Sequence, residues 1–196
     1  LASGLYEKYV DGVYHSKQNN GGLDGRQAAK DTIWLFNDND GENGEAYVSA
    51  IQIRNGKLSA EEIEDLGPAE ASGISIPQGA EPIRGLWSFD NGDLSAGVGS
   101  SLEYLDGPDG ATAGATEFGT TDSFELPGIQ GETAAVMKVG YVGANANFGY
   151  LMKHGIAPNG GGNRLNQYSL VYDVYFTGGG NGWPSQIGRA SCRERV

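Results

Sequence analysis

Oxygen-bearing side chains are densest in the segment "NDNDGENGE", residues 37–45. Carboxylates, amides and backbone carbonyls are the ligands that Ca²⁺ takes in proteins. The segment is not an EF-hand loop, because aligning Gly41 with the invariant glycine of that loop places Phe36 and Tyr47 at ligand positions. Asn, Asp and Gly also supply turn geometry, so a solvated loop is the favoured interpretation. The alternative is a structural Ca²⁺ site with the ligands Asp38, Asp40, Asn43 and Glu45.

Two further groups are weaker candidates. The segment "SFDNGDLSA" offers oxygen ligands to Ca²⁺ at Asp90, Asn91 and Asp93, but turn formation explains the same residues and is favoured. Trp183 follows the cluster "GGGNG", where an aromatic face suits the apolar side of a pyranose. A core position at the start of a strand is the favoured interpretation for Trp183. Trp34 and Trp87 lie inside apolar strand patterns and are predicted core residues.

The sequence shows no catalytic signature. The two histidines, His15 and His154, are far apart in the chain, and neither an H-E-x-x-H nor a G-x-S-x-G motif occurs. The acidic run "AEEIEDLG" has the pattern of a helix, and "FELPGIQGE" has no matching carboxylate for a glycosidase pair. The glycine clusters lack the Lys and Ser/Thr of a phosphate-binding loop. We therefore expect no enzymatic activity and no resident cofactor other than Ca²⁺.

Composition limits the partners. The chain has 196 residues, 33 of them glycine, and a formal net charge of −12. Such acidity disfavours nucleic acid and anionic membrane surfaces. No apolar run approaches the roughly eighteen residues needed to cross a bilayer, so we expect no membrane insertion.

Short strand patterns dominate the chain. Asp11-Gly12, flanked by alternating apolar residues, predicts a hairpin, and "TIWLF" (32–36) predicts a buried strand. The segment "EAYVSAIQIRN" alternates, which places Tyr47, Ser49, Ile51 and Ile53 on one face and Ala46, Val48 and Ala50 on the other. Ser59 and Glu62 in capping-box spacing, with Gly67 as a stop, predict a helix over 60–66.

Residues 68–85 contain three prolines and little periodicity, and they are predicted to be a linker. Beyond them the strand patterns resume in "GLWSFD", "SSLEYLD", "AAVMKVG", "FGYLMKHG" and "NQYSLVYDVYF". Many short strands with one short helix predict an all-β fold, an antiparallel β-sandwich.

A family resemblance follows from these motifs. In order, "YVDGV", "GLDGR", "LFNDNDGENGEAYVSAIQI" and "LSAEEIEDLG" resemble the C-terminal half of a laminin-G-like (concanavalin A-like) jelly-roll domain. The stretch from "LWSFDNGDLSAGVGSSLEYLDG" to "NQYSLVYDVYF" is similar to the N-terminal half of another. The resemblance implies two incomplete tandem domains, residues 1–67 and 86–186, in a secreted or surface-attached bacterial multidomain protein.

Each half alone would leave a sheet face uncovered and strand edges unpaired. The end of one domain and the start of a homologous one are complementary parts of one fold in permuted order. The linker therefore allows a second arrangement, in which the two halves pair as one circularly permuted sandwich.

The resemblance implies a non-catalytic module for adhesion or for binding carbohydrate or protein, with Ca²⁺ as a structural ion. Its partners would be a glycan or an extracellular protein and other domains of a larger chain, and its location extracellular or at the cell surface. One alternative is an accessory module of a secreted glycosidase or phosphoesterase whose catalytic domain lies outside this chain. A second alternative is a structural spacer.

The last ten residues, "IGRASCRERV" (187–196), differ from the rest in holding the only cysteine and three arginines. They resemble one translated frame of a widely used sequencing adapter, residue for residue. A basic partner-binding tail or a reactive thiol would not account for that identity. We therefore expect the natural coding sequence to stop at Gln186, and Cys192 carries no functional weight in this interpretation.

Overall fold

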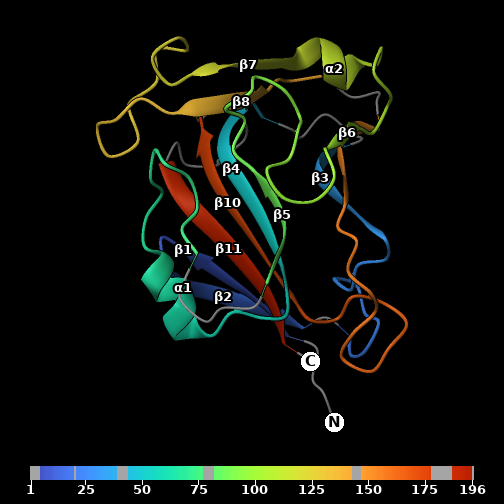
Figure 1. Cartoon of the computed structure of the whole chain (residues 1–196). Helices are drawn as coiled ribbons and strands as arrows, with labels where there is room; N and C mark the ends of the chain where they lie inside the picture. Colours follow the sequence, from blue (N-terminus) through green and yellow to red (C-terminus); the bar gives the residue numbers. More distant parts are fainter. Residues whose placement is uncertain are drawn as a thin grey trace.

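A computed structural model describes residues 5–19, 21–38, 44–76, 82–142, 147–177 and 187–195, the last of these by their backbone (Figure 1). Two antiparallel sheets pack face to face, which confirms the predicted all-β sandwich. Among the described residues, no helix is both long and apolar enough to cross a membrane.

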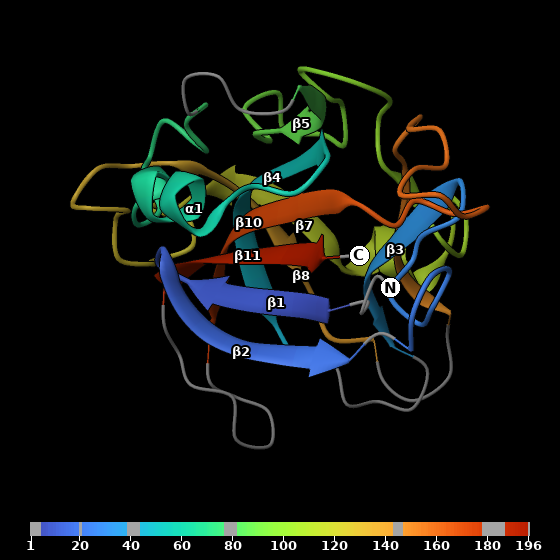
Figure 2. The ribbon, with the colours of Figure 1, turned by 90° about the horizontal axis from the view of Figure 1, so that it is seen from below.

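The large sheet contains eight strands, and β5 (Ile83–Trp87) joins it by pairing with β4. The other strands follow one another in the order β2 (Val13–Asn19), β1 (Leu5–Val10), β11 (Ile187–Arg195), β10 (Tyr168–Phe176), β4 (Ala46–Asn55), β8 (Ala135–Val139) and β7 (Thr116–Thr120). The small sheet has the order β3 (Thr32–Asp38), β9 (Phe148–Lys153) and β6 (Glu103–Tyr104). Figure 2 shows β2, β1, β11 and β10 side by side.

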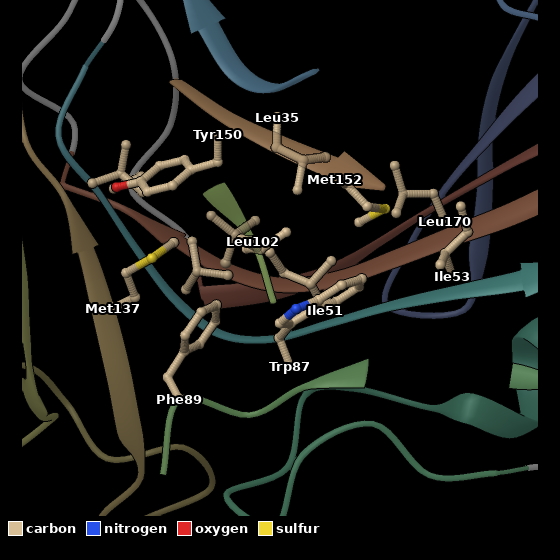
Figure 3. Packing of buried hydrophobic residues seen from close by; sticks show 14 of the residues in the cluster. Leu35, Ile51, Ile53, Trp87, Phe89, Leu102, Met137, Tyr150, Met152 and Leu170 are labelled. Carbon is tan, nitrogen blue, oxygen red and sulfur yellow. The ribbon is translucent and has the colours of Figure 1, made fainter. Parts of the chain in front are cut away.

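Both sheets combine strands from the two predicted half-domains. In the large sheet β4 lies between β10 and β8, and in the small sheet β3 pairs with β9. One core between the sheets likewise takes Leu35 and Ile51 from the first half and Trp87, Tyr150 and others from the second (Figure 3). The two halves thus form one sandwich. Its relation to a laminin-G-like domain by circular permutation stays a prediction.

The hairpin predicted at Asp11-Gly12 is present. It joins β1 to β2, and both turn residues have positive φ, 48° at Asp11 and 78° at Gly12. On its other side β1 pairs with β11, which also pairs with β10. The backbone of residues 187–195 therefore fills a position inside the large sheet. That placement does not bear on the adapter origin, which stays a prediction.

The face assignment predicted for β4 is wrong beyond its middle. Ala50 pairs with Asp173 but Val48 pairs with Val174, so Ser49 is an extra residue in the ladder. A bulge of this kind reverses which side chains face each side of a sheet. As a result Ala46, Val48, Ile51 and Ile53 all lie in the core between the sheets.

Helix α1 (Ala60–Leu66) forms where the capping box predicted it. The Ser59 hydroxyl accepts a hydrogen bond from the Glu62 backbone N–H at 3.1 Å, and the Glu62 carboxylate accepts one from the Ser59 N–H at 2.6 Å. The helix covers the outer face of the large sheet, where Ile63 and Leu66 are buried in a cluster with Ala50 and Val171. It is terminated by Gly67, which has a φ of 62°.

A second helix, α2 (Ala111–Ala115), was not predicted. It is short and contains a glycine, so its sequence carries little helical signal. The carboxylate of Asp106 accepts a hydrogen bond from the backbone N–H of Thr112 at 2.9 Å and so stabilises the first turn.

The predicted linker is partly structured. Strand β5 begins at Ile83, inside the predicted range 68–85. Ala69 is buried with Ile129 and Ala134, and Ile74 is buried in the cluster under α1. The isolated apolar residues between the prolines give no periodic signal, so the sequence does not distinguish this packed segment from a linker.

Candidate binding surface on the small sheet

Trp34 was predicted to lie in the core, and this prediction is wrong. Its side chain is 57% exposed, whereas the neighbouring Leu35 is 4% exposed. Strand β3 is an edge of the small sheet, and alternate residues along it point to opposite faces. In "TIWLF" only Thr32 is polar and the four residues after it are apolar, so the sequence does not distinguish Trp34 from a buried residue. Trp87 is 0% exposed, as predicted.

The strand register surrounds Trp34 with a defined set of side chains. Trp34 pairs with Leu151, which pairs with Glu103 on its other side, so the three form a line across the outer face of the sheet. Next to them Thr32 pairs with Lys153. We call these five residues the Trp34 row. Lys153 and Glu103 are both exposed, and their side chains form an ion pair with 2.5 Å between Nζ and Oε1.

The inner face of the same strands gives the Trp34 row a rigid base. Tyr150 is 0% exposed, its hydroxyl lies 2.6 Å from the Thr116 hydroxyl, and burial raises the pKa of Tyr150. At the end of β3 the ladder is irregular, and the Asn37 side chain donates to the Phe148 carbonyl at 2.8 Å. A side chain on Gly149 would clash with the Leu35 carbonyl, so a glycine there allows the two strands to approach.

The principal calcium candidates lie only partly within the described residues. Asp40 and Asn43 fall outside them, and Asp38 is described by its backbone at the end of β3. Glu45 accepts a hydrogen bond from the Tyr47 hydroxyl at 3.0 Å and forms an ion pair with Lys138 at 3.3 Å. In the described part of the chain, no three His, Cys, Asp or Glu side chains are grouped as metal ligands. A calcium site here stays a prediction.

The weaker calcium candidates form a turn. The Asp93 carboxylate accepts the Ser95 backbone N–H at 2.8 Å, and Asn91 donates to the Ser95 hydroxyl at 3.1 Å. Hydrogen bonding from the Ser95 side chain, and then from its backbone N–H, lowers the pKa of Asp93. Asp90 is exposed. The geometry is the turn chemistry that the sequence favoured. Trp183, the remaining candidate, lies outside the described residues.

His154 connects two segments far apart in the chain, whereas His15 contacts the adjacent Ser16. His154 is 3% exposed; its Nδ1 accepts the Ile156 N–H at 3.1 Å, and its Nε2 donates to the Lys30 backbone oxygen. His15 is exposed on β2, with its Nδ1 3.2 Å from the Ser16 hydroxyl. His154 therefore holds two loops together through both ring nitrogens. Absence of catalysis stays a prediction.

No family model, no curated protein and no solved structure matches this chain. The resemblance to laminin-G-like domains therefore stays a prediction.

Proposed function

We propose that this chain is a non-catalytic binding module whose ligand is carbohydrate and whose binding surface is the Trp34 row. The observation that carries the proposal is the exposure of Trp34, 57% of its side chain, in a regular strand that packs its other face into the core. An exposed tryptophan costs solvation free energy, because its large apolar surface remains in contact with water.

The neighbours of Trp34 suit a sugar. An indole face stacks on the C–H side of a pyranose ring, and Leu151 extends the apolar surface beside it. Lys153 supplies hydrogen-bond donors, while Glu103 supplies acceptors for hydroxyl groups. Since the two charges are paired, the surface carries polar groups without a strong local field.

The remaining parts of the proposal rest on the laminin-G-like resemblance. They are an extracellular or cell-surface location, attachment to other domains of a bacterial parent protein, and a structural Ca²⁺ bound at residues 38–45. Binding of carbohydrate by the Trp34 row does not depend on any of them.

The test is a glycan array probed with the wild-type chain, Trp34→Ala and Tyr141→Ala. Tyr141 is the matched control, because it is an aromatic residue 61% exposed outside the Trp34 row. We expect the wild type and Tyr141→Ala to bind the same glycans. Loss of a stacking contact worth about 1 kcal/mol or more should weaken binding of Trp34→Ala by roughly tenfold.

Each array is run with Ca²⁺ and with a chelator, which separates the Trp34 row from a calcium-dependent site. Absence of binding to every glycan under both conditions would overturn the proposal and favour a spacer. Equal binding by Trp34→Ala and wild type would overturn the assignment of the surface.

A further inference from the structure

A pocket lies immediately before β3, at the end of the sheet that carries the Trp34 row. Its volume is about 280 Å³, and its walls are the segments 29–31 and 156–165. These segments lie next to each other at the lower right of Figure 1, in blue and orange. Its lining includes Lys30, Asp31, Ile156, Pro158, Arg164 and Leu165.

The walls of the pocket are held by hydrogen bonds between the two segments. Ala29 and Leu165 exchange backbone hydrogen bonds of 3.1 and 2.8 Å. His154, which is buried, connects the Lys30 carbonyl to the N–H of Ile156. These contacts preform the pocket, and a preformed site spends less free energy on ordering when it binds.

The Asp24 side chain holds the wall of the pocket that contains Asn163 and Arg164. Its carboxylate accepts the backbone N–H groups of Asn163 at 2.8 Å and Arg164 at 2.9 Å, together with the Asn166 amide at 2.9 Å. The Asn163 bond is the largest cause of the lowered pKa of Asp24. Asn166 is 0% exposed and accepts the Asp24 N–H in return at 2.8 Å. The backbone of Arg164 is thus fixed at the pocket, with its side chain half-buried in the lining.

The charged residues of the lining favour a ligand with one negative charge over a ligand with two. Lys30 and Arg164 are cationic and Asp31 is anionic, and among the described residues none of the three forms an ion pair within 4.0 Å. The lining residues are therefore positive by one charge, and the Asp24 carboxylate behind Arg164 adds a second negative charge beside the pocket. Asp31 and Asp24 would oppose a doubly charged phosphate more than a singly charged carboxylate, which takes charge-assisted bonds from Lys30 and Arg164.

We propose that this pocket binds the carboxylate-bearing residue of an acidic oligosaccharide, a hexuronate, whose neighbouring sugar stacks on Trp34. The inference rests on the proposed function and names its ligand class. Asp31 precedes Trp34 by three residues, roughly 10 Å along an extended chain, which a short oligosaccharide can span. Pro158, which is exposed in the lining, offers an apolar surface to the ring, and Asp31 offers an acceptor for its hydroxyls.

The experiment is calorimetric titration with trigalacturonate and with its fully methyl-esterified form, which has the same rings without the charges. Wild type should bind the acid more tightly than the ester. Arg164→Gln and Lys30→Gln should each weaken binding of the acid about tenfold and leave binding of the ester unchanged. Arg84→Gln is the matched control, because Arg84 is an exposed arginine on β5 outside the pocket. Free galacturonate, titrated separately, shows whether the pocket alone suffices.

The outcomes separate the two proposals. If Trp34→Ala weakens both probes while Arg164→Gln and Lys30→Gln change neither, this inference is overturned and the Trp34 surface stands. If the pocket variants lose the acid while Trp34→Ala binds like wild type, the pocket stands and the Trp34 surface does not. A wild type that binds acid and ester equally, or neither, overturns the inference. Thermal melting of each variant by circular dichroism establishes that it is folded.

Discussion

Trp34 and Trp87 are both tryptophans in apolar strand segments, but one side chain is exposed and the other is buried. Trp87 ends β5 and points between the sheets (Figure 3). Its indole N–H donates a hydrogen bond to the Ser100 carbonyl at 3.2 Å. It is 0% exposed, while Trp34 on the edge strand β3 is 57% exposed. One side chain therefore stabilises the sandwich and the other is available to a ligand. The difference lies in the face of the sheet that each side chain occupies, because Trp87 faces the core and Trp34 faces outward.

The largest expected effect is on folding stability. Trp87→Ala should lower the free energy of unfolding by about 3–5 kcal/mol, because it removes a fully buried aromatic residue and leaves a cavity. Trp34→Ala should lower it by less than about 0.5 kcal/mol, as expected at an exposed site. Urea unfolding followed by far-ultraviolet circular dichroism measures both. Similar losses of unfolding free energy in Trp87→Ala and Trp34→Ala would contradict the assignment of Trp87 to the core and Trp34 to the surface.

A smaller effect is expected from filling the space beside Trp87. A Cβ on Gly85 would overlap the Trp87 ring and touch Ile53, so Gly85→Ala should cost about 1–3 kcal/mol through overpacking. The matched control is Gly114→Ala in α2, where a Cβ meets nothing within 4 Å. In Gly114→Ala the free energy of unfolding should rise by roughly 0.5–1 kcal/mol, because alanine restricts the unfolded chain and favours the helix. If Gly85→Ala were as stable as wild type, the Trp87 ring would have room to move away from residue 85, and the close contact between them would be wrong.

The smallest expected effect concerns the loops that lead to β3. The pKa of Asp24 is lowered in the folded chain, first by the Asn163 N–H, so its carboxylate favours folding at pH values above its unfolded pKa of about 3.9. That contribution is lost as the pH falls through the lower, folded pKa. Stability should therefore decrease with falling pH below about 4.

The pH profile of Asp24→Asn should have a shallower acid slope than wild type, measured as melting temperature between neutral and acidic pH. Asp93 and Asp106 also have lowered pKa values, so some slope remains in this variant. Asp109→Asn is the matched control, because it removes an exposed aspartate outside the pocket. An unchanged slope in Asp24→Asn would show that the clamp on Asn163 and Arg164 contributes nothing to acid stability.

Much of the fold follows from local signals in the chain. The hairpin at Asp11-Gly12 and the helix from Ala60 to Leu66 form where turn and capping residues predicted them, because those interactions join residues only a few positions apart. The sandwich class also follows, since many short strands must bury their apolar faces against another layer. The turn at Asp93 is equally local.

Only the tertiary structure decided the rest. The bulge at Ser49 arises from pairing with β10, more than a hundred residues away, and it reversed the predicted faces of β4. The exposure of Trp34 depends on which face of the small sheet packs against the large sheet, since Leu35 on the same strand is in the core. The pocket combines segments 29–31 and 156–165, which no local pattern connects. Local sequence thus determined the turns, the cap and the layer type, whereas long-range strand pairing determined which side chains reach solvent and which meet.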